Sequence, residues 1–129
     1  MLQESGVETR VFKTSLKNGI CQTVVKPDAI IDLADAMENT NIVEGLSNGN
    51  LYPLLVDVRK IKSISKEARN HFSMRNRQPG VKAIAMLVKS PVSRVIGYFF
   101  VSLNKPNVPF RLFTSEEKAM KWLEQFIPA

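Results

Sequence analysis

The chain has 129 residues, of which 44% are hydrophobic and 23% charged, a size and composition that fit one globular domain with its own core. Its longest apolar stretch, residues 95–103, has about half the length of a membrane span, so we expect no transmembrane helix. The first ten residues lack the apolar core of a signal peptide, and the single cysteine, Cys21, has no partner for an internal disulfide. These features favour a cytoplasmic protein in which Cys21 is a buried strand residue.

The net charge of +6 is unevenly distributed. Residues 59–94 contain ten Lys and Arg and only one acidic residue, Glu67, so this segment carries a charge of +9 against −3 for the rest of the chain. Such an asymmetry indicates either an anionic or acidic partner or simply a solvated helix face with basic loops. No aromatic residues alternate with these charges as they do in base-stacking surfaces, which argues against nucleic acid as the partner.

The N-terminal region predicts a β-hairpin. Two strand-like segments, Thr9–Leu16 and Ile20–Val25, are separated by a turn that contains Asn18 and Gly19. Both of these residues tolerate the positive φ that a type I′ turn requires. Residues 1–8 are expected to be a flexible N-terminal segment.

A first helix is predicted to begin after Asp32, which can cap it, with Asp35 three residues further on as in a capping box. Segment 38–41 has poor helix propensity, so an early break is open, and Ser47–Asn50 is predicted to be a loop. The inward face is predicted to be a stripe at helical spacing, formed by Leu33, Ala36, Met37, Thr40 and Val43.

A central strand and a second helix follow. Leu54–Val58 is short, apolar on both faces and rich in β-branched residues, as expected of a strand in the middle of a sheet. After a basic loop, a helix from about Lys66 to Asn76 is predicted, and Ser65 can cap it. Such strand–helix units place their binding crevice at the carboxyl ends of the strands. The only histidine, His71, has no catalytic partner near it in sequence and is predicted to be a surface or boundary residue.

The next unit has the same order. Val81–Val88 is predicted to be a buried strand, and Ser90 and Pro91 are the expected cap and first residue of a third helix. Val92–Leu103 is apolar at helical spacing and apolar on its other side as well, so this helix is either deeply buried or used at an interface. We expect two such helices to pair and form a homodimer, since helix pairing readily buries faces of this kind. The candidate interface residues are Val95, Tyr98, Phe99, Val101 and Ser102.

The chain is predicted to end with a strand and a helix. Val108–Phe113 contains Pro109, which indicates an edge strand or an irregular start. Thr114 and Glu117 have the spacing of a capping box and are expected to begin the last helix. The predicted order is therefore β-β-α-β-α-β-α-β-α, a layered α/β fold.

Four segments together resemble a known family: Leu55–Arg59, Ser63–Arg69, Ser90–Gly97 and Arg111–Ala119. The chain resembles a family of small bacterial proteins with the fold of the STAS domain, which is the fold of the sporulation-type anti-sigma-factor antagonists. This resemblance implies a single domain over residues 1–129. It implies a mixed, mostly parallel sheet of about five strands with a leading β-hairpin and four helices. It implies no enzymatic activity, because the family has no established one.

In the antagonists with this fold, a serine at the start of the helix after the central strand is phosphorylated within an Asp-Ser-Ser-Gly motif. The resemblance places that motif on Ser65–Ala68, where Lys66 occupies the position of the modified serine. The standard switch is therefore in doubt, and Ser63 and Ser65 are the candidates for phosphorylation instead. Their simpler roles are in a turn and in a helix cap.

Enzymes need a nucleophile with a base, a carboxylate pair or metal ligands, and the sequence shows none of these patterns and no Gly-rich phosphate loop. We therefore expect no catalysis, no cofactor and no metal site.

Two binding functions stay open. In the first, the N-termini of the second and third helices lie side by side and dock an acidic or phosphorylated segment of a protein partner. In the alternative, the protein carries or senses a small anionic or lipid-like ligand, held between this basic edge and the apolar helix 92–103. The candidate binding edge comprises Asp57, Arg59, Lys62, Ser63, Ser65, Lys66, Ser90, Ser93 and Arg94.

Overall fold

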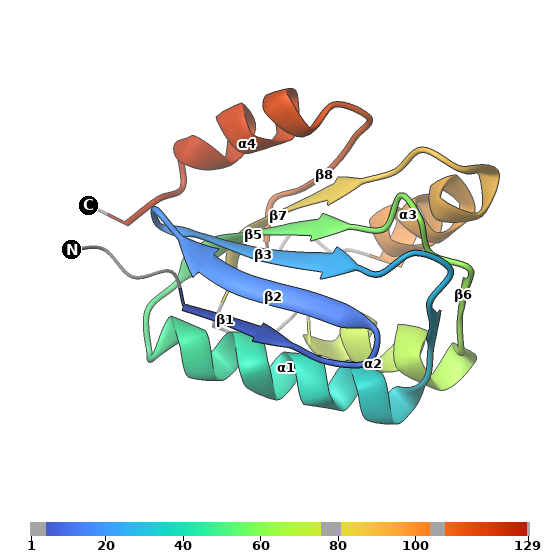
Figure 1. Cartoon of the computed structure of the whole chain (residues 1–129). Coiled ribbons are helices and arrows are strands. Elements are labelled where there is room, and N and C mark those ends of the chain that lie inside the picture. The colour runs from blue at the N-terminus through green and yellow to red at the C-terminus, as the bar shows by residue number, and fades with distance from the viewer. Residues whose placement is uncertain (1–4, 76–80, 104–107, 129) are drawn as a thin grey trace.

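A six-stranded mixed sheet organises the fold (Figure 1). The structure is a computed structural model that describes residues 5–75, 81–103 and 108–128. In spatial order the strands are β1 (Ser5–Glu8), β2 (Phe12–Lys17), β3 (Ile20–Val25), β5 (Tyr52–Asp57), β7 (Val81–Leu87) and β8 (Phe110–Phe113). The pairs β1–β2 and β2–β3 are antiparallel, whereas β3, β5, β7 and β8 run parallel to one another. The expected mixed, mostly parallel sheet is confirmed.

The hairpin at the start of this sheet is confirmed, but the segment before it differs from the expectation. Asn18 and Gly19 have φ angles of 54° and 82°, as the Asn-Gly turn predicts. Ser5–Glu8 is not a free segment: it forms β1, whose backbone pairs with β2 and places Val7 opposite Thr14. Residues 1–4 lie outside the described residues.

Four helices cover the two faces of the sheet: α1 (Leu33–Ser47), α2 (Lys66–Arg75), α3 (Pro91–Leu103) and α4 (Glu116–Glu124). In Figure 1, α4 lies above the sheet, and α1 and α2 lie below it. The four helices agree with the expectation. None of the described helices has the length and hydropathy that crossing a membrane would require.

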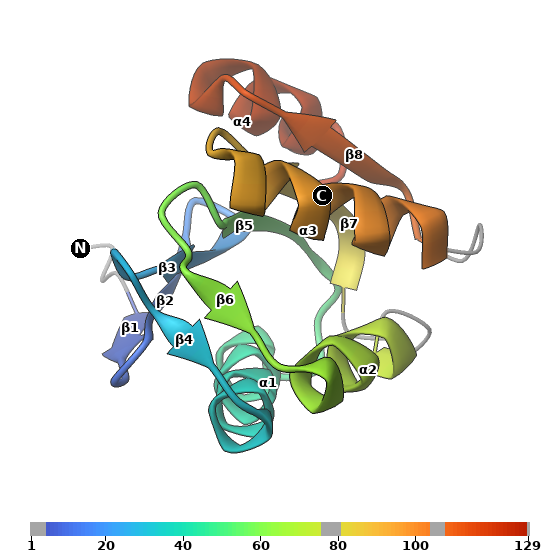
Figure 2. The same cartoon turned by 90° about the vertical axis from the view of Figure 1, so that its right-hand side faces the viewer.

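A second, two-stranded sheet was not predicted. It pairs β4 (Ile30–Ile31) with β6 (Ser63–Ile64) in parallel, beside the ends of α1 and α2 (Figure 2). Two-residue strands are too short to show any hydrophobic alternation, so the sequence gives no local signal for them. Together with β1, they explain why the strands outnumber the five expected.

Alternate side chains of the central strands build two separate cores. On β5, Leu55 packs towards α4, and its neighbour Val56 packs towards α1, α2 and α3. On β7, Ala83 and Ala85 are small enough for α4 to approach closely through Ala119. Both faces of β5 and β7 are therefore covered, as expected of strands in the middle of a parallel sheet.

Helix α1 is rotated relative to the predicted stripe. Leu33 and Met37 are 39% and 49% exposed, whereas Asp35 and Asn39 are buried. The polar residues turn inward because the strands beneath them offer partners, as Thr14 does when its Oγ1 donates to Asn39 Oδ1 at 2.5 Å. The helix also continues through segment 38–41 to Ser47 without the early break considered above.

The cap residues are mostly as predicted. Asp32 and Asp35 form the expected capping box of α1. Ser65 and Ser90 cap α2 and α3, since their Oγ atoms accept hydrogen bonds from backbone N–H groups three residues on. The prediction for α4 is wrong by one residue: the cap is Ser115, whose Oγ accepts from the Lys118 N–H at 3.3 Å, and not Thr114.

Replacing Asn39 by Ala is expected to lower the free energy of unfolding by about 1–3 kcal/mol, because the buried hydroxyl of Thr14 loses its acceptor. Urea denaturation measures this change. Asn41, which is exposed on the same helix, is the matched control, and its replacement by Ala should leave the stability within about 0.5 kcal/mol of wild type. Equal effects of the two substitutions would show that the inward-facing amide contributes nothing to stability.

The pH dependence of the unfolding free energy tests whether the thiol of Cys21 is buried. Its side chain is 1% exposed, and burial raises the pKa of its thiol to about 11, from an ordinary value of about 8.5. The thiol therefore contributes stability that is complete below about pH 8.5 and is lost as the pH rises towards 11, because only the unfolded chain ionises in this range. The difference in unfolding free energy between wild type and Cys21→Val should be constant at neutral pH and shift against wild type between those values. A constant difference up to pH 11 would contradict this.

Candidate functional site

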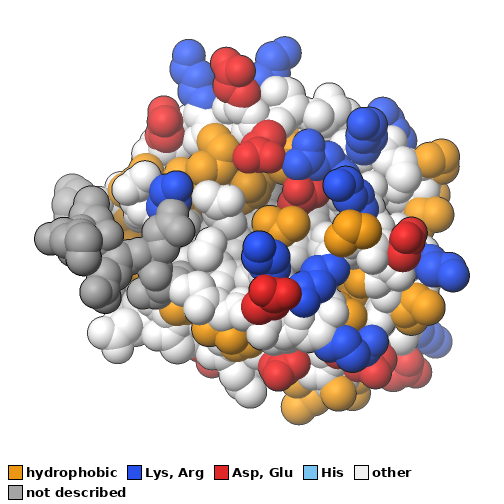
Figure 3. Space-filling view, in the orientation of Figure 1, with side chains coloured by type: hydrophobic (Ala, Val, Ile, Leu, Met, Phe, Trp, Pro, Cys, Tyr) orange, Lys and Arg blue, Asp and Glu red, His pale blue; other side chains and the backbone are white. Residues whose placement is uncertain are grey.

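The carboxyl ends of the parallel strands β3, β5, β7 and β8 meet at one edge of the sheet, on the right in Figure 1. The predicted binding residues lie on the segments that follow β5 and β7 at this edge. Figure 3 shows many Lys and Arg side chains on this half of the molecule, with hydrophobic side chains among them at the rim where α3 lies in Figure 1.

Asp57 and Arg59, at the end of β5, are bound to each other. The guanidinium of Arg59 donates through Nε to Asp57 Oδ1 at 3.0 Å and through Nη2 to Oδ2 at 2.8 Å, and the backbone N–H of Arg59 also donates to Oδ1. Nη2 reaches Glu116 Oε1 at 3.1 Å as well. The hydrogen bonds that Arg59 donates to Asp57 and the charges of both carboxylates raise the pKa of Arg59. Two carboxylates already neutralise this cation, so it has little charge to offer an anionic partner.

The start of α3 is held by a compact set of hydrogen bonds. Ser93 is fully buried, and its Oγ accepts from the Lys89 N–H at 2.7 Å and donates to the Ser90 carbonyl at 2.8 Å. Its hydroxyl is thus occupied inside the fold and does not face a partner. Arg94 is exposed, with its Nε donating to the Lys89 carbonyl at 3.1 Å.

The start of α2 presents a different surface. Ser65 is half-buried, and its Oγ accepts from the Ala68 N–H at 3.1 Å, so it has the cap role. Ser63 is exposed on β6, and Lys62 and Lys66 are exposed beside it. Phosphorylation of Ser63 or Ser65 stays a prediction.

The expectation that the two helix N-termini lie side by side is wrong. Eight residues separate the end of β5 from α2, and two of them are tied to β4 as strand β6. In Figure 2, α2 begins beyond the C-terminal end of β6, whereas α3 lies above β6. Figure 1 likewise places α3 above α2. The basic residues of the candidate edge are consequently divided between two places.

Helix α3 has one buried and one exposed face, and both are apolar. On the buried face, a Cβ at Gly97 would lie 2.9 Å from Val88 Cγ1 and 3.0 Å from Leu112 Cδ2, so the helix backbone lies directly against its neighbours. The exposed face contains four large hydrophobic side chains, Val92, Val95, Tyr98 and Val101, which are 45%, 68%, 63% and 41% exposed. Of the other predicted interface residues, Ser102 is exposed and Phe99 half-buried.

Arg69 links α2 to α3, a contact that the sequence did not indicate. Its guanidinium carbon lies 5.0 Å from the ring centroid of Phe99, within the range of a cation–π interaction. Its Nε is buried and has no hydrogen-bond partner among the described residues. The aromatic face therefore supplies the main attraction that the structure gives this cation.

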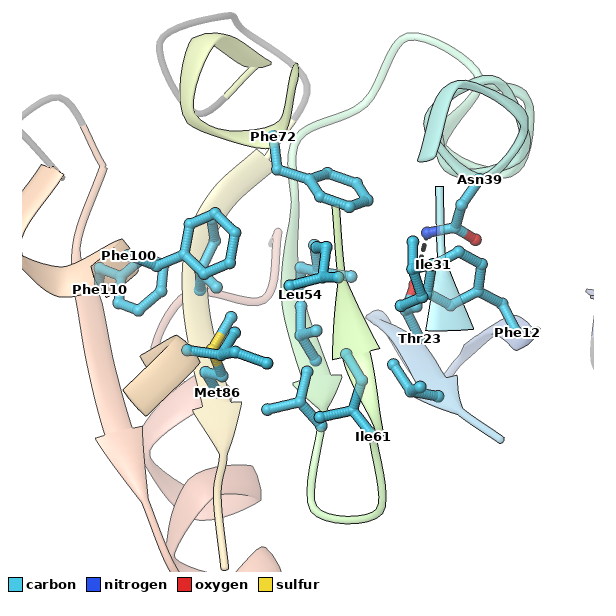
Figure 4. A pocket seen from close by; sticks show the side chains of 16 residues that line it. Phe12, Thr23, Ile31, Asn39, Leu54, Ile61, Phe72, Met86, Phe100 and Phe110 are labelled. Carbon is cyan, nitrogen blue, oxygen red and sulfur yellow. Dashed lines mark hydrogen bonds between the residues drawn. The ribbon is translucent and has the colours of Figure 1, made fainter. Parts of the chain in front are cut away.

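An interior cavity of about 90 Å³ lies between the sheet and helices α1, α2 and α3 (Figure 4). Sixteen residues line it, and all but Thr23 and Asn39 are apolar. A void of this size costs about 2 kcal/mol relative to a filled interior. The volume is far below the roughly 300–1,000 Å³ typical of ligand pockets, so an acyl chain does not fit. This cavity could not be predicted from the sequence, because its lining residues, from Phe12 to Phe110, are widely separated along the chain.

The residues that could have suggested chemistry have structural partners. His71 is half-buried, with its Nε2 2.8 Å from Thr40 Oγ1, which agrees with a boundary residue. Within the part of the chain that the structure describes, no three His, Cys, Asp or Glu side chains are grouped in a way that could hold a metal ion.

Replacing Asp57 by Ala is expected to cost about 1–3 kcal/mol in unfolding free energy, because a buried acceptor of three hydrogen bonds from Arg59 is removed. Glu116→Gln should cost less than about 1 kcal/mol, because its bond to the same guanidinium is exposed. Thermal and urea denaturation of both variants measure the difference. If Glu116→Gln cost as much as Asp57→Ala, the exposed carboxylate and not the buried one would fix this cation.

Two solved structures can be compared with this geometry. A protein of the DUF3478 family from Shewanella loihica PV-4, described as having a SpoIIAA-like fold, is 16% identical, with a TM-score of 0.56. The match covers 94% of this chain and 92% of that one, and it confirms the anti-sigma-factor-antagonist (STAS) fold that the sequence resembles. A protein of unknown function from Arthrobacter sp. FB24 is 31% identical, with a TM-score of 0.34, over 86% of this chain and 97% of that one.

A search among curated proteins finds no match. The family described as a domain of unknown function, DUF7793, matches residues 14–127, which include every helix and all but the first two strands of the fold in full. The chain therefore belongs to the DUF7793 family.

Proposed function

We propose that the protein is a non-catalytic interaction module of the STAS type, which docks an acidic, amphipathic segment of a protein partner on the exposed face of α3. The observation that carries this proposal is the row of exposed apolar side chains on that helix. Val95 and Tyr98 are the most exposed of them, and together with Val92 they form an apolar surface on a rigid element. Surfaces of this kind on a monomer commonly mark sites of protein–protein contact.

The charge around this face favours an acidic partner. Helix α3 contains no Asp or Glu, and Arg94 lies exposed on it. Lys89, just before α3, is exposed as well. An acidic rim on the partner would complement these cations, and such complementarity speeds association and excludes wrong partners.

The same charges disfavour a second copy of the chain as the occupant. A two-fold contact is self-complementary, so pairing two α3 helices would bring the Arg94 side chains of both copies to one interface. Like charges brought together in this way oppose association. The homodimer predicted from the apolar helix is therefore the competing occupant that an experiment has to separate from the acidic segment.

The proposal requires no catalytic step. Asp57 and Ser93, which lie at the edge where α/β enzymes keep functional groups, are both used in hydrogen bonds that hold the local backbone.

Photo-crosslinking in cells of the protein's own host tests the docking face. A photoreactive phenylalanine analogue at position 98 should give a defined adduct with another protein, and the crosslinked peptide should be acidic. Adding Val95→Glu should abolish this adduct, because a carboxylate then faces the acidic segment. Met37, which is 49% exposed on α1, is the matched control: the probe at position 37 should give no such adduct, and Met37→Glu should not affect crosslinking at 98.

Sedimentation velocity of the purified protein tests whether a second copy of the chain, and not another protein, occupies this face. A monomer at micromolar concentration is expected. A dimer that dissociates in Val95→Glu, together with crosslinks only between copies of the chain, would show that the face serves self-association. Adducts of equal yield at positions 37 and 98 would contradict the proposal altogether.

A further inference from the structure

The interior cavity has one polar corner, at Thr23 and Asn39. Figure 4 shows the amide nitrogen of Asn39 on the side of Phe72 and Leu54, with the amide oxygen turned away from them. Both polar residues are buried, and α1 supplies one of them while β3 supplies the other. A chemical group inside the cavity would meet this corner and otherwise only hydrocarbon and the thioether of Met86.

The hydrogen bonds of this corner can be assigned completely. Asn39 Oδ1 accepts the hydroxyl hydrogen of Thr14 at 2.5 Å, so the Thr14 oxygen, 3.2 Å from Thr23 Oγ1, must accept from Thr23. Thr23 in turn accepts from Asn39 Nδ2 at 3.3 Å. The three side chains form a closed ring in which each donates once. The amide nitrogen carries two hydrogens and this ring uses one, so one buried donor is left over.

We propose that this cavity is a binding site for a small, neutral, mainly apolar molecule that carries one hydrogen-bond acceptor, such as a short aliphatic ketone or aldehyde. The acceptor oxygen binds the second N–H of Asn39, and the hydrocarbon part lies among the aliphatic and aromatic walls. The site is separate from the docking face, because it lies on the inner side of α3, where Ile96 and Phe100 line it.

Charge and size define the class of ligand. No charged side chain lines the cavity, so an anion would be buried without a partner, which is strongly unfavourable. The anionic ligand considered from the sequence is thus disfavoured here. A cavity of about 150 Å³ holds benzene, which has six carbons, so by the same ratio 90 Å³ accommodates about four non-hydrogen atoms.

Acetone and xenon are the probes that test this site on the full chain. In ¹H–¹⁵N NMR spectra, acetone should cause saturable shifts at Thr23, Asn39 and Val56, with an affinity in the millimolar range or tighter. Xenon, which has no acceptor, should bind the same cavity through its apolar walls alone. Propylammonium, of similar size but charged, should cause no saturable shift at these residues.

Two variants test separately the hydrogen-bond donor of Asn39 and the volume of the cavity. Asn39→Leu retains the approximate shape but removes the donor, so the affinity for acetone should fall at least five-fold while xenon binding persists. Asn41→Leu, on the exposed side of α1, is the control. Val56→Phe places a ring in the cavity and should abolish the binding of both probes.

Three results would overturn the inference. The first is shifts that rise linearly with the concentration of acetone without saturating, as weak surface contact produces. The second is unchanged binding of both probes in Val56→Phe. The third is equal losses of acetone affinity in Asn39→Leu and Asn41→Leu. Because none of these measurements involves the exposed face of α3, failure here leaves the crosslinking experiment unaffected.

Discussion

Strands β5 and β7 lie in the middle of the sheet, and their side chains must be removed from water on both faces. This constraint decides where the helices lie. Leu55 requires a cover on one side, which α4 provides, and Val56 requires one on the other, which α1, α2 and α3 provide together. The two faces of the sheet are covered in different ways. Alanines on β7 let α4 approach closely, whereas three separate helices have to converge on the opposite side.

That convergence explains both the buried polar ring and the cavity. Helix α1 crosses strands that carry Thr14 and Thr23, so it turns Asn39 towards them and leaves Leu33 and Met37 in solvent. The hydrogen-bonded partners of this amide fix its position. Hydrophobic burial alone would have selected the other face of the helix. The satisfied polar contact prevails because an unpaired buried hydroxyl is costly.

Most of the fold could be predicted because its signals lie between residues close in sequence. The cap at Ser90, the turn at Asn18–Gly19 and the order of strands and helices all follow from local hydrogen bonding and hydrophobic period. The features that could not be predicted depend on pairs distant in sequence. Ile30 pairs with Ser63, which is distant in sequence, and the segment between β5 and α2 that contains Ser63 places the start of α2 away from α3. The cavity likewise has no local signal, so the sequence predicted a candidate binding edge but neither its division into two places nor the cavity.

Helix α3 has a buried side, with Ile96 and Phe100, and an open side, with Val95 and Tyr98, and Gly97 holds its middle against Val88 and Leu112. The cavity wall and the exposed apolar face are therefore two sides of one helix. Binding in the cavity and binding on the exposed face would then both act on α3. Thermodynamic linkage makes such sharing reciprocal: whatever factor an inner occupant applied to an outer affinity, the outer partner would apply to the inner one. Helix α3 would in this way couple ligand binding in the cavity to partner binding on the surface.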